Sequence, residues 1–172
     1  MERDVSTFLG IAQIAAVLAG FAALVSVIAN RPDRPSLRRE LFQLRGVVGI
    51  GVIAVVAALL PIGIHRYGFS ESAGWRISSL LFLVGIWVGI LGSRSSEYSQ
   101  RYAFRDGALL STFFWGVLEP CIQIPLVLGA LGFHPSLAPA FYLSGLVLNV
   151  CQAAVLFARV VASAVFSSDA AR

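Results

Sequence analysis

The sequence predicts an all-α integral membrane protein, a bundle of five transmembrane helices in a single transmembrane domain over 1–172. The chain is 58% hydrophobic and only 13% charged, whereas a soluble domain averages about 45–50% apolar and about 25% charged residues. Its apolar residues gather in long runs of the length that a helix needs to cross about 30 Å of hydrocarbon. A domain of this size cannot hide such an apolar surplus in its own core, so lipid must cover it.

Five apolar runs of about 20 residues or more are separated by polar or proline-containing segments. They predict spans at about 6–29, 46–65, 75–93, 108–132 and 137–166. The first run is not preceded by the basic leader of a signal peptide, so we expect it to be retained. Two prolines within 30–35 end it, since proline does not continue a helix. A four-span alternative would require one run to lie in the interface or to re-enter the membrane.

The segment over 36–45 is predicted to form an interfacial helix that leads into the second span. Its leucines share one face, while Arg38, Arg39 and Arg45 can reach lipid headgroups. We therefore expect these arginines to bind anionic lipids on the cytoplasmic side. Every basic residue of the chain is an arginine, which excludes chemistry that needs a lysine Schiff base.

The arginines also predict the orientation of the chain. Ten of the 13 basic residues fall on the side that holds 30–45, 94–106 and the C-terminal tail, and three fall on the other side. The positive-inside rule then predicts an N-out, C-in topology in the bacterial inner (cytoplasmic) membrane. Because these arginines flank apolar spans, the net charge of +4 indicates membrane orientation and no nucleic-acid partner.

Small residues recur at every fourth position of three spans and predict helix contacts. In the third span, which begins at the interfacial residue Trp75, Gly85 and Gly89 form a GxxxG motif that allows a second helix to approach closely. The other stripes are Ala15, Ala19 and Ala23, and Ala154, Ala158 and Ala162. Such contacts form within a subunit or between the subunits of a homo-oligomer.

The fourth span departs from an ordinary membrane helix. Glu119 lies about eleven residues, or roughly 16 Å, inside it, and an ionisable group at that depth is a functional-site hypothesis by default. Pro120 and Pro125 lack the N–H groups that would bond to the carbonyls of Gly116 and Cys121. We therefore expect the fourth helix to be kinked or broken, with Gly116, Pro120 and Pro125 at the break.

Four polar side chains are candidates for an ion- or proton-binding site. Gln123 lies one turn after Glu119, and an antiparallel hairpin would face Asn149 and Gln152 of the fifth span towards them. Carboxylate and amide oxygens suit a proton, Na⁺ or Ca²⁺. In the alternative, the amides, including Gln13 of the first span, are interhelical hydrogen-bond donors and acceptors, and Glu119 is a protonated packing residue.

The remaining chemistry-bearing side chains point to no enzyme. Cys121 and Cys151 form no CxxC pair and are predicted to be small buried hydrophobes. His65 and His134, at the outer ends of helices, are expected to be amphipathic interfacial residues, although two histidines on one face can bind a metal or sense pH. No nucleophile–base pair, P-loop, dinucleotide motif or HExxH is present. We expect no catalytic residue, cofactor or metal; a membrane enzyme acting on lipid or quinone is a third possibility.

The segment Trp115–Pro120 resembles the pore motif of the mitochondrial calcium uniporter family, in which a tryptophan and an acidic residue precede an apolar pair and Glu-Pro. In that family the Glu of each subunit joins a carboxylate ring that binds Ca²⁺. The resemblance implies that Glu119 is a ring ligand and Trp115 its packing support. Gly116 stands where the family has its first acidic residue, and the family has two spans instead of five.

The first half of the chain also resembles small multi-pass membrane proteins of bacteria, through 20–24, 60–68 and Trp75. That resemblance implies no activity. The sequence therefore predicts an ion-conducting or proton-coupled membrane protein, an oligomeric cation channel or transporter with Glu119 at its site. The alternative is a non-catalytic accessory, sensor or interaction subunit.

Overall fold

The computed structural model describes residues 2–28, 35–94 and 114–169, and in these ranges the chain consists of helices joined by short turns, with no strand. The four long helices are α1 (Glu2–Ile28), α2 (Pro35–Arg66), α3 (Glu71–Arg94) and α7 (Ala138–Asp169). Between α3 and α7 lie the π-helical turn η1 (Phe114–Leu118), the helix α6 (Glu119–Leu131) and the 3-10 turn η2 (Pro135–Leu137). The prediction of an all-α chain is confirmed.

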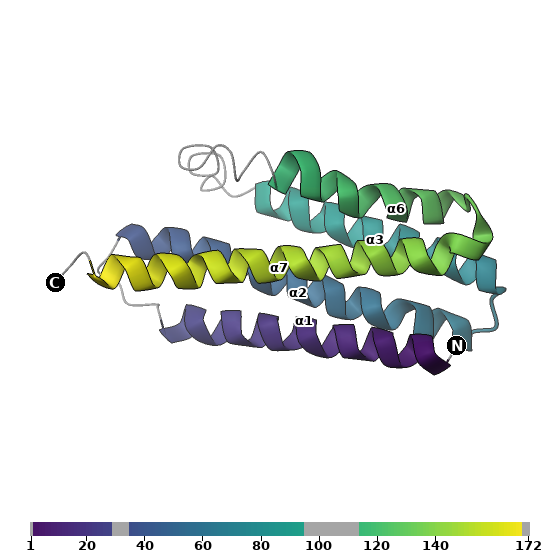
Figure 1. The fold of residues 1–172 in the computed structure, drawn as a ribbon, viewed down its shortest axis with the longest axis horizontal. Helices are drawn as coiled ribbons and strands as arrows, with labels where there is room; N and C mark the ends of the chain where they lie inside the picture. Colours follow the sequence, from purple (N-terminus) through teal and green to yellow (C-terminus); the bar gives the residue numbers. More distant parts are fainter. Residues whose placement is uncertain (1, 29–34, 95–113, 170–172) are drawn as a thin grey trace.

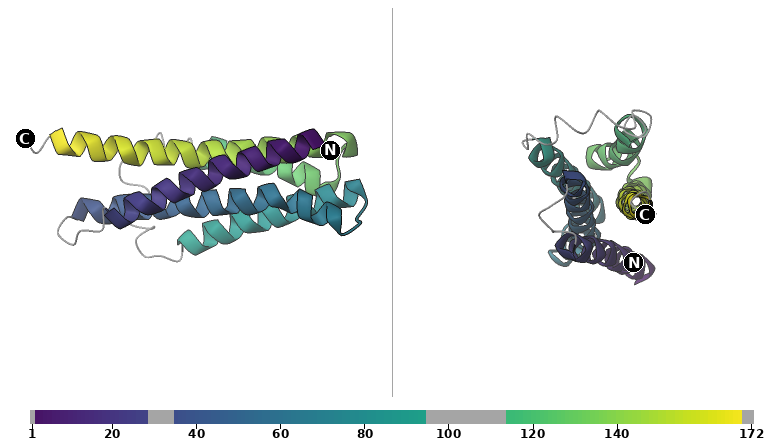
Figure 2. Two further views of the ribbon diagram at one scale, coloured as in Figure 1. Left: turned by 90° about the horizontal axis from the view of Figure 1, so that it is seen from below. Right: turned by 90° about the vertical axis from the view of Figure 1, so that its left-hand side faces the viewer.

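The helices lie side by side along the long axis of the molecule (Figure 1). Helices α2 and α7 are central, because α2 packs against α1, α3 and α7, and α7 packs against α6 as well. The N-terminus lies at the end that holds the α2–α3 and α6–α7 turns, and the C-terminus lies at the opposite end (Figures 1 and 2).

Helices α1, α2, α3 and α7 are long and apolar enough to cross a membrane. Their apolar stretches are Val5–Ser26, Leu44–Arg66, Glu71–Gly92 and Pro135–Ala162. The chain therefore has the build of a multi-pass membrane protein. Gly116–Leu131 forms a shorter apolar helix, and residues 108–113, where the fourth span is predicted to begin, lie outside the described residues.

The segment predicted as an interfacial helix is continuous with the second span. Helix α2 is 32 residues long and runs from Pro35 to Arg66 with Pro61 inside it. At about 1.5 Å per residue it measures about 48 Å, which exceeds the roughly 30 Å hydrocarbon core. Its first turns therefore extend past the core, and no break separates 36–45 from the apolar stretch that follows.

The turn between α6 and α7 is closed by a glycine cap. Gly132 has a φ of 74°, and its N–H donates to the Gly129 carbonyl at 3.1 Å while that of Phe133 donates to the Leu128 carbonyl at 3.0 Å. This pair of bonds is the Schellman motif. The guanidinium of Arg76, from α3, occupies the space that a Cβ at 132 would need. The positive φ favours glycine at 132, whereas the flexible Arg76 side chain could move aside for a Cβ.

Aromatic side chains from three helices form the core near the N-terminal end of the molecule. The Tyr142 ring centroid lies 6.0 Å from that of Phe8, 5.7 Å from that of Trp75 and 5.8 Å from that of Phe82. The Tyr142 hydroxyl donates to the Ala57 carbonyl of α2 at 2.5 Å, which satisfies a polar group that would otherwise be buried without a partner. This cluster joins α1, α2, α3 and α7.

The glycine and alanine stripes of the first and third spans lie at contacts with α2. Ala15 and Ala19 are buried, and a Cβ added to Gly51 of α2 would lie 2.8 Å from the Ala19 Cβ. Gly85 and Gly89 face α2 as well: added Cβ atoms would lie 3.6 and 3.0 Å from Ile53 side-chain atoms. Small residues therefore allow α1 and α3 to pack closely on α2.

The stripe predicted in the fifth span does not coincide with the buried face of α7. Ala154 is half-buried, and Ala158 and Ala162 are exposed. The buried face of α7 carries Tyr142, Leu146, Asn149, Gln152, Ala153 and Val160. The alanine stripe is thus turned away from the contacts that the described chain makes with itself.

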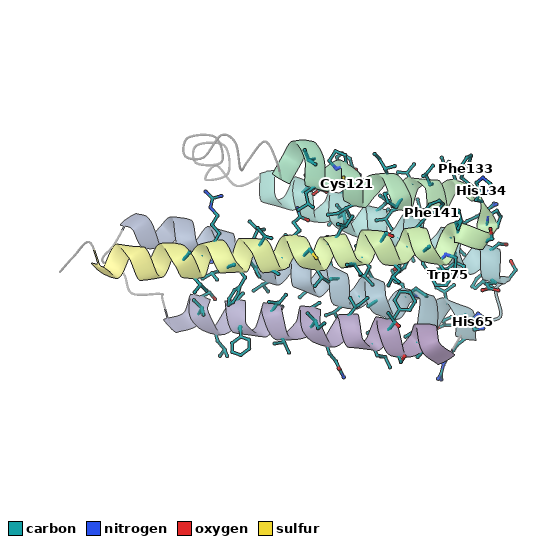
Figure 3. All side chains as sticks on the ribbon, viewed as in Figure 1. His65, Trp75, Cys121, Phe133, His134 and Phe141 are labelled. Carbon is teal, nitrogen blue, oxygen red and sulfur yellow. The ribbon has the colours of Figure 1, made fainter. Side chains whose placement is uncertain are left out.

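The prediction that both cysteines are buried is wrong. Cys121 and Cys151 are free and exposed, and Figure 3 labels Cys121 on α6. Gln13 is exposed on α1, so in the described chain it is not among the buried amides that lie between helices. Both differences have one cause: lipid is as apolar as the protein interior, so the apolar residues around these side chains do not reveal which face of the helix is buried.

Candidate functional site

Glu119 is the first residue of α6 and is buried, with 8% of its surface exposed. It directly follows the π-helical turn Phe114–Leu118, a rare element found frequently at functional sites. Pro120 follows within the first turn of α6 and has no backbone N–H to donate to the preceding turn. Gly132 comes thirteen positions after Glu119, so Glu119 lies about 20 Å along the helix from the α6–α7 turn.

Two amide side chains hold the two oxygens of Glu119. Gln123 Nε2, one turn later on α6, donates to Glu119 Oε1 at 2.9 Å. Gln152 Nε2 of α7 donates to Glu119 Oε2 at 3.1 Å. The structure thus brings together three of the four predicted ligands, and the carboxyl group is fixed by bonds from two helices.

Asn149, the fourth predicted ligand, lies on the same buried face of α7 as Gln152. A Cβ on Gly145 of α7 would lie 2.8 Å from Leu126 Cγ and 3.2 Å from the Ile122 carbonyl oxygen of α6. Since α6 and α7 are antiparallel, this register puts Asn149 at the level of Ile122, about one turn beyond Glu119. Asn149 is 4% exposed, and its Oδ1 is buried without a hydrogen-bond partner. It therefore offers a spare acceptor beside the Glu119 cluster.

No positive charge neutralises Glu119 among the residues that the structure describes, where its bonds come from two neutral amides. An unpaired buried charge is costly and drives a group to take up a proton or a counter-ion. The amide bonds stabilise the carboxylate in part but carry no net charge. The arrangement can therefore hold a proton on Glu119 or a cation beside it.

A cavity of about 440 Å³ lies between α3 and α6 and reaches Glu119. Its lining consists of Trp87, Ile90, Glu119, Pro120, Gln123, Ile124, Val127 and Leu128. Among the described residues that line it, Glu119 and Gln123 are the only ones with a charged or amide side chain. Trp87 is 48% exposed, Ile124 58% and Val127 42%, so the cavity opens on the outside of the bundle. We refer to it as the α3–α6 groove.

Two residues of α3 that face α6 were not singled out from the sequence. Trp87 lies inside the GxxxG motif, and nothing local to that motif indicates that it lines the same cavity as Glu119. Ser79 of α3 is fully buried with an unpartnered Oγ, and a Cβ on Gly129 of α6 would lie 2.8 Å from this atom. The polar character of Ser79 in an apolar span was the available signal, but its neighbour is 50 positions away in the chain.

The other predicted site residues lie apart from this cluster. Gly116 is exposed within the π-helical turn, and Pro125 is half-buried inside α6. Arg45 is exposed on α2, and the side chains of Arg38 and Arg39 lie outside the described residues. His65 and His134 are both exposed at the end of the molecule that holds the N-terminus (Figure 3). Within the described ranges, no three or more His, Cys, Asp or Glu residues are grouped as metal ligands would be.

Comparison of the chain with protein-family models finds no match, and comparisons with curated proteins and with solved structures find none either.

Proposed function

We propose that this chain is a proton-coupled cation transporter in which Glu119 binds a proton or a cation in turn. The observation that carries the proposal is a buried carboxyl group held by Gln123 and Gln152, with no basic side chain paired to it in the described part of the chain. A carboxyl group in this setting is neutral when protonated and needs a counter-ion when it is not. Because a proton and a cation compete for the same carboxylate, binding of one can drive release of the other.

The geometry supports a site within one subunit better than a ring of carboxylates. Glu119 bonds to α6 and α7 of its own chain, whereas a ring ligand of the kind that the uniporter-like motif implies would point to a shared axis. The spare Asn149 Oδ1, about one turn away, supplies a further oxygen acceptor. The carbonyl of Cys121 lacks its usual helical partner, because Pro125 has no N–H. We therefore favour a transporter over a channel.

The fourth span is proposed to bend at this site. The π-helical turn precedes Glu119 and Pro120 follows it. Both features weaken the regular ladder of backbone hydrogen bonds. A segment with fewer backbone bonds can change its angle when Glu119 exchanges its proton. Such backbone irregularity at membrane depth is tolerated where it lines a cavity.

We further propose an N-out, C-in orientation in the bacterial inner membrane, five crossings and assembly as a homo-oligomer. The arginine distribution supports the orientation. Exposed alanines of the fifth-span stripe, such as Ala158 and Ala162, support a contact with a second copy. Arg45 and its neighbours on the first turns of α2 would then bind anionic headgroups.

Cation-driven proton flux in liposomes tests the proposal. Glu119→Gln keeps the size of the side chain but removes its charge and its proton, so we expect it to abolish flux. Glu71→Gln, on the exposed first turn of α3, is the matched control and should transport normally. Flux that is unchanged in Glu119→Gln would sink the assignment.

The alternative, an accessory or interaction subunit, is favoured by one observation: both Glu119 bonds lie within the chain. In that case Glu119 is a permanently protonated packing residue. Infrared spectra would then contain a protonated carboxyl band at all accessible pH values, lost in Glu119→Gln, and liposomes would show no flux. A band that exchanges with cation supports the transporter instead.

A further inference from the structure

The α3–α6 groove has the composition of a binding site for an amphipathic ligand. Its walls are apolar side chains such as Ile90, Ile124 and Leu128, and its polar groups, Glu119 and Gln123, come from one wall. The cavity volume of about 440 Å³ lies within the roughly 300–1,000 Å³ of small-molecule sites. A ligand that fits must be largely apolar and must present one polar group to Glu119.

The sign of that polar group follows from the charges in the groove. A carboxylate offers about four acceptor positions, of which the two amide bonds occupy one on each oxygen. Among the described residues no basic side chain lines the groove, so ionised Glu119 would repel an anion and would find no counter-ion in a neutral ligand. Trp87 lines the opposite wall, and an indole ring attracts a cation that lies over its face within about 6 Å.

A bare metal ion fits this groove poorly. Ca²⁺ takes about 6–8 oxygen ligands, whereas the described lining of the groove presents the side-chain oxygens of Glu119 and Gln123 among apolar side chains. A lipophilic cation needs no such shell, because its charge is spread over an apolar body that the groove can contact. The open side of the groove is lined by exposed apolar residues, so such a molecule can enter from the lipid.

We propose that the α3–α6 groove binds a lipophilic organic cation, with Glu119 as its counter-ion and Trp87 as its aromatic wall. This inference rests on the proposed function, since it names the substrate class that exchanges with the proton. Protonated Glu119 and the free cation give ionised Glu119 with the cation bound, and the carboxyl proton leaves to water. Charge and protons balance, and no further reactant is needed.

Binding of tetraphenylphosphonium to the protein in nanodiscs of neutral lipid tests the inference, with empty nanodiscs subtracted. The wild type should bind the cation saturably. Glu119→Gln should weaken binding by roughly two orders of magnitude, as expected when a buried charge pair loses one partner. Tetraphenylborate, which has the same shape and the opposite charge, should not bind to the wild type.

Variants in the groove wall test the groove while leaving the Glu119 side chain unchanged. Ile124→Trp fills the groove from its rim and should abolish cation binding while the Glu119 bonds remain, and Trp87→Leu should weaken it. Val155→Trp, on the exposed face of α7, is the matched control and should bind like the wild type. Helical content and elution volume, equal to those of the wild type, establish that each variant is folded.

The possible results distinguish this inference from the proposed function. If Ile124→Trp binds the cation normally, or if tetraphenylborate binds as well, the groove assignment is overturned. If Glu119→Gln abolishes flux of an inorganic cation while tetraphenylphosphonium never binds, this inference fails and the transporter proposal stands. If Glu119→Gln changes neither flux nor binding, both fail.

Discussion

Gln152 of α7 donates a hydrogen bond from Nε2 to Glu119 Oε2 at 3.1 Å, and the two residues are 33 positions apart in the chain. This bond sets the register of α6 against α7 at the level of the carboxyl group. With the bond from Gln123, it holds the acid in one orientation. The position of Glu119 therefore depends on the packing of two helices.

Gln152→Leu should destabilise the bundle by about 1 kcal/mol, because it removes the hydrogen bond to Glu119. Hydrogen bonds between membrane helices contribute roughly 0.6 kcal/mol on average, and a buried polar group left without a partner costs about 1–3 kcal/mol. A double-mutant cycle with Glu119→Gln, followed by unfolding in denaturing detergent, should give a coupling free energy of similar size. Gln13→Leu, on the exposed side of α1, should have little effect. Additive effects of the two substitutions would contradict the bond.

Gly145→Ala should destabilise the α6–α7 pair by about 1–3 kcal/mol, the usual cost of overpacking. Its new Cβ would lie 2.8 Å from Leu126 Cγ and 3.2 Å from the Ile122 carbonyl oxygen. Gly20→Ala is the matched control, since nothing lies within 4 Å of its added Cβ, and it should be neutral or stabilise by about 0.5–1 kcal/mol. The midpoints of detergent unfolding measure both, and equal shifts would argue against the close approach.

Tyr142→Phe should cost about 0.5–1.5 kcal/mol, because the Ala57 carbonyl loses the hydroxyl that donates to it. Tyr142→Ala should cost more, about 3–5 kcal/mol, since it also leaves a cavity among Phe8, Trp75 and Phe82. Thermal unfolding followed by circular dichroism measures both. Tyr67→Phe, at an 84% exposed position, should leave the midpoint unchanged.

Thiol labelling tests the membrane arrangement. Cys121 and Cys151 are exposed on apolar helices, so in membranes they should react with a lipophilic maleimide and resist a charged, membrane-impermeant one. In detergent-free vesicles, rapid reaction of either cysteine with the charged reagent would place it in water instead.

The same reagents test the orientation of the chain. Ser70 is exposed between α2 and α3, and Ser70→Cys in a cysteine-free background should react with the impermeant reagent added to intact spheroplasts. Labelling that requires disruption of the membrane would reverse the N-out, C-in proposal.

The sequence predicted the helices well, because their lengths and the breaks between them follow from local composition. The helix bounds at Arg66 and Leu131 lie within one residue of the predicted ends. The start of α2 was less predictable, since the polar segment 36–45 and the apolar run after it join in one helix. Helix propensity does not distinguish an interfacial turn from a spanning one.

The site was predictable in part. The i, i+4 spacing of Glu119 and Gln123 places them together on any helix, and a short α6–α7 turn brings Gln152 to the same neighbourhood. The packing of α3 against α6 was not predictable from the sequence. Trp87 and Ser79 of α3 come close to α6 only through contacts between segments that are distant in the chain.

The sequence by itself determined a helical chain that crosses lipid, with an acid and two prolines in one unusual span. Only the tertiary structure decided which face of each helix is buried: it exposes Cys121 and Ala158 and buries Asn149 beside the Glu119 cluster. In water, hydrophobic periodicity marks the buried face of a helix. In lipid both faces are apolar, so close packing and a few polar side chains decide which one turns inward.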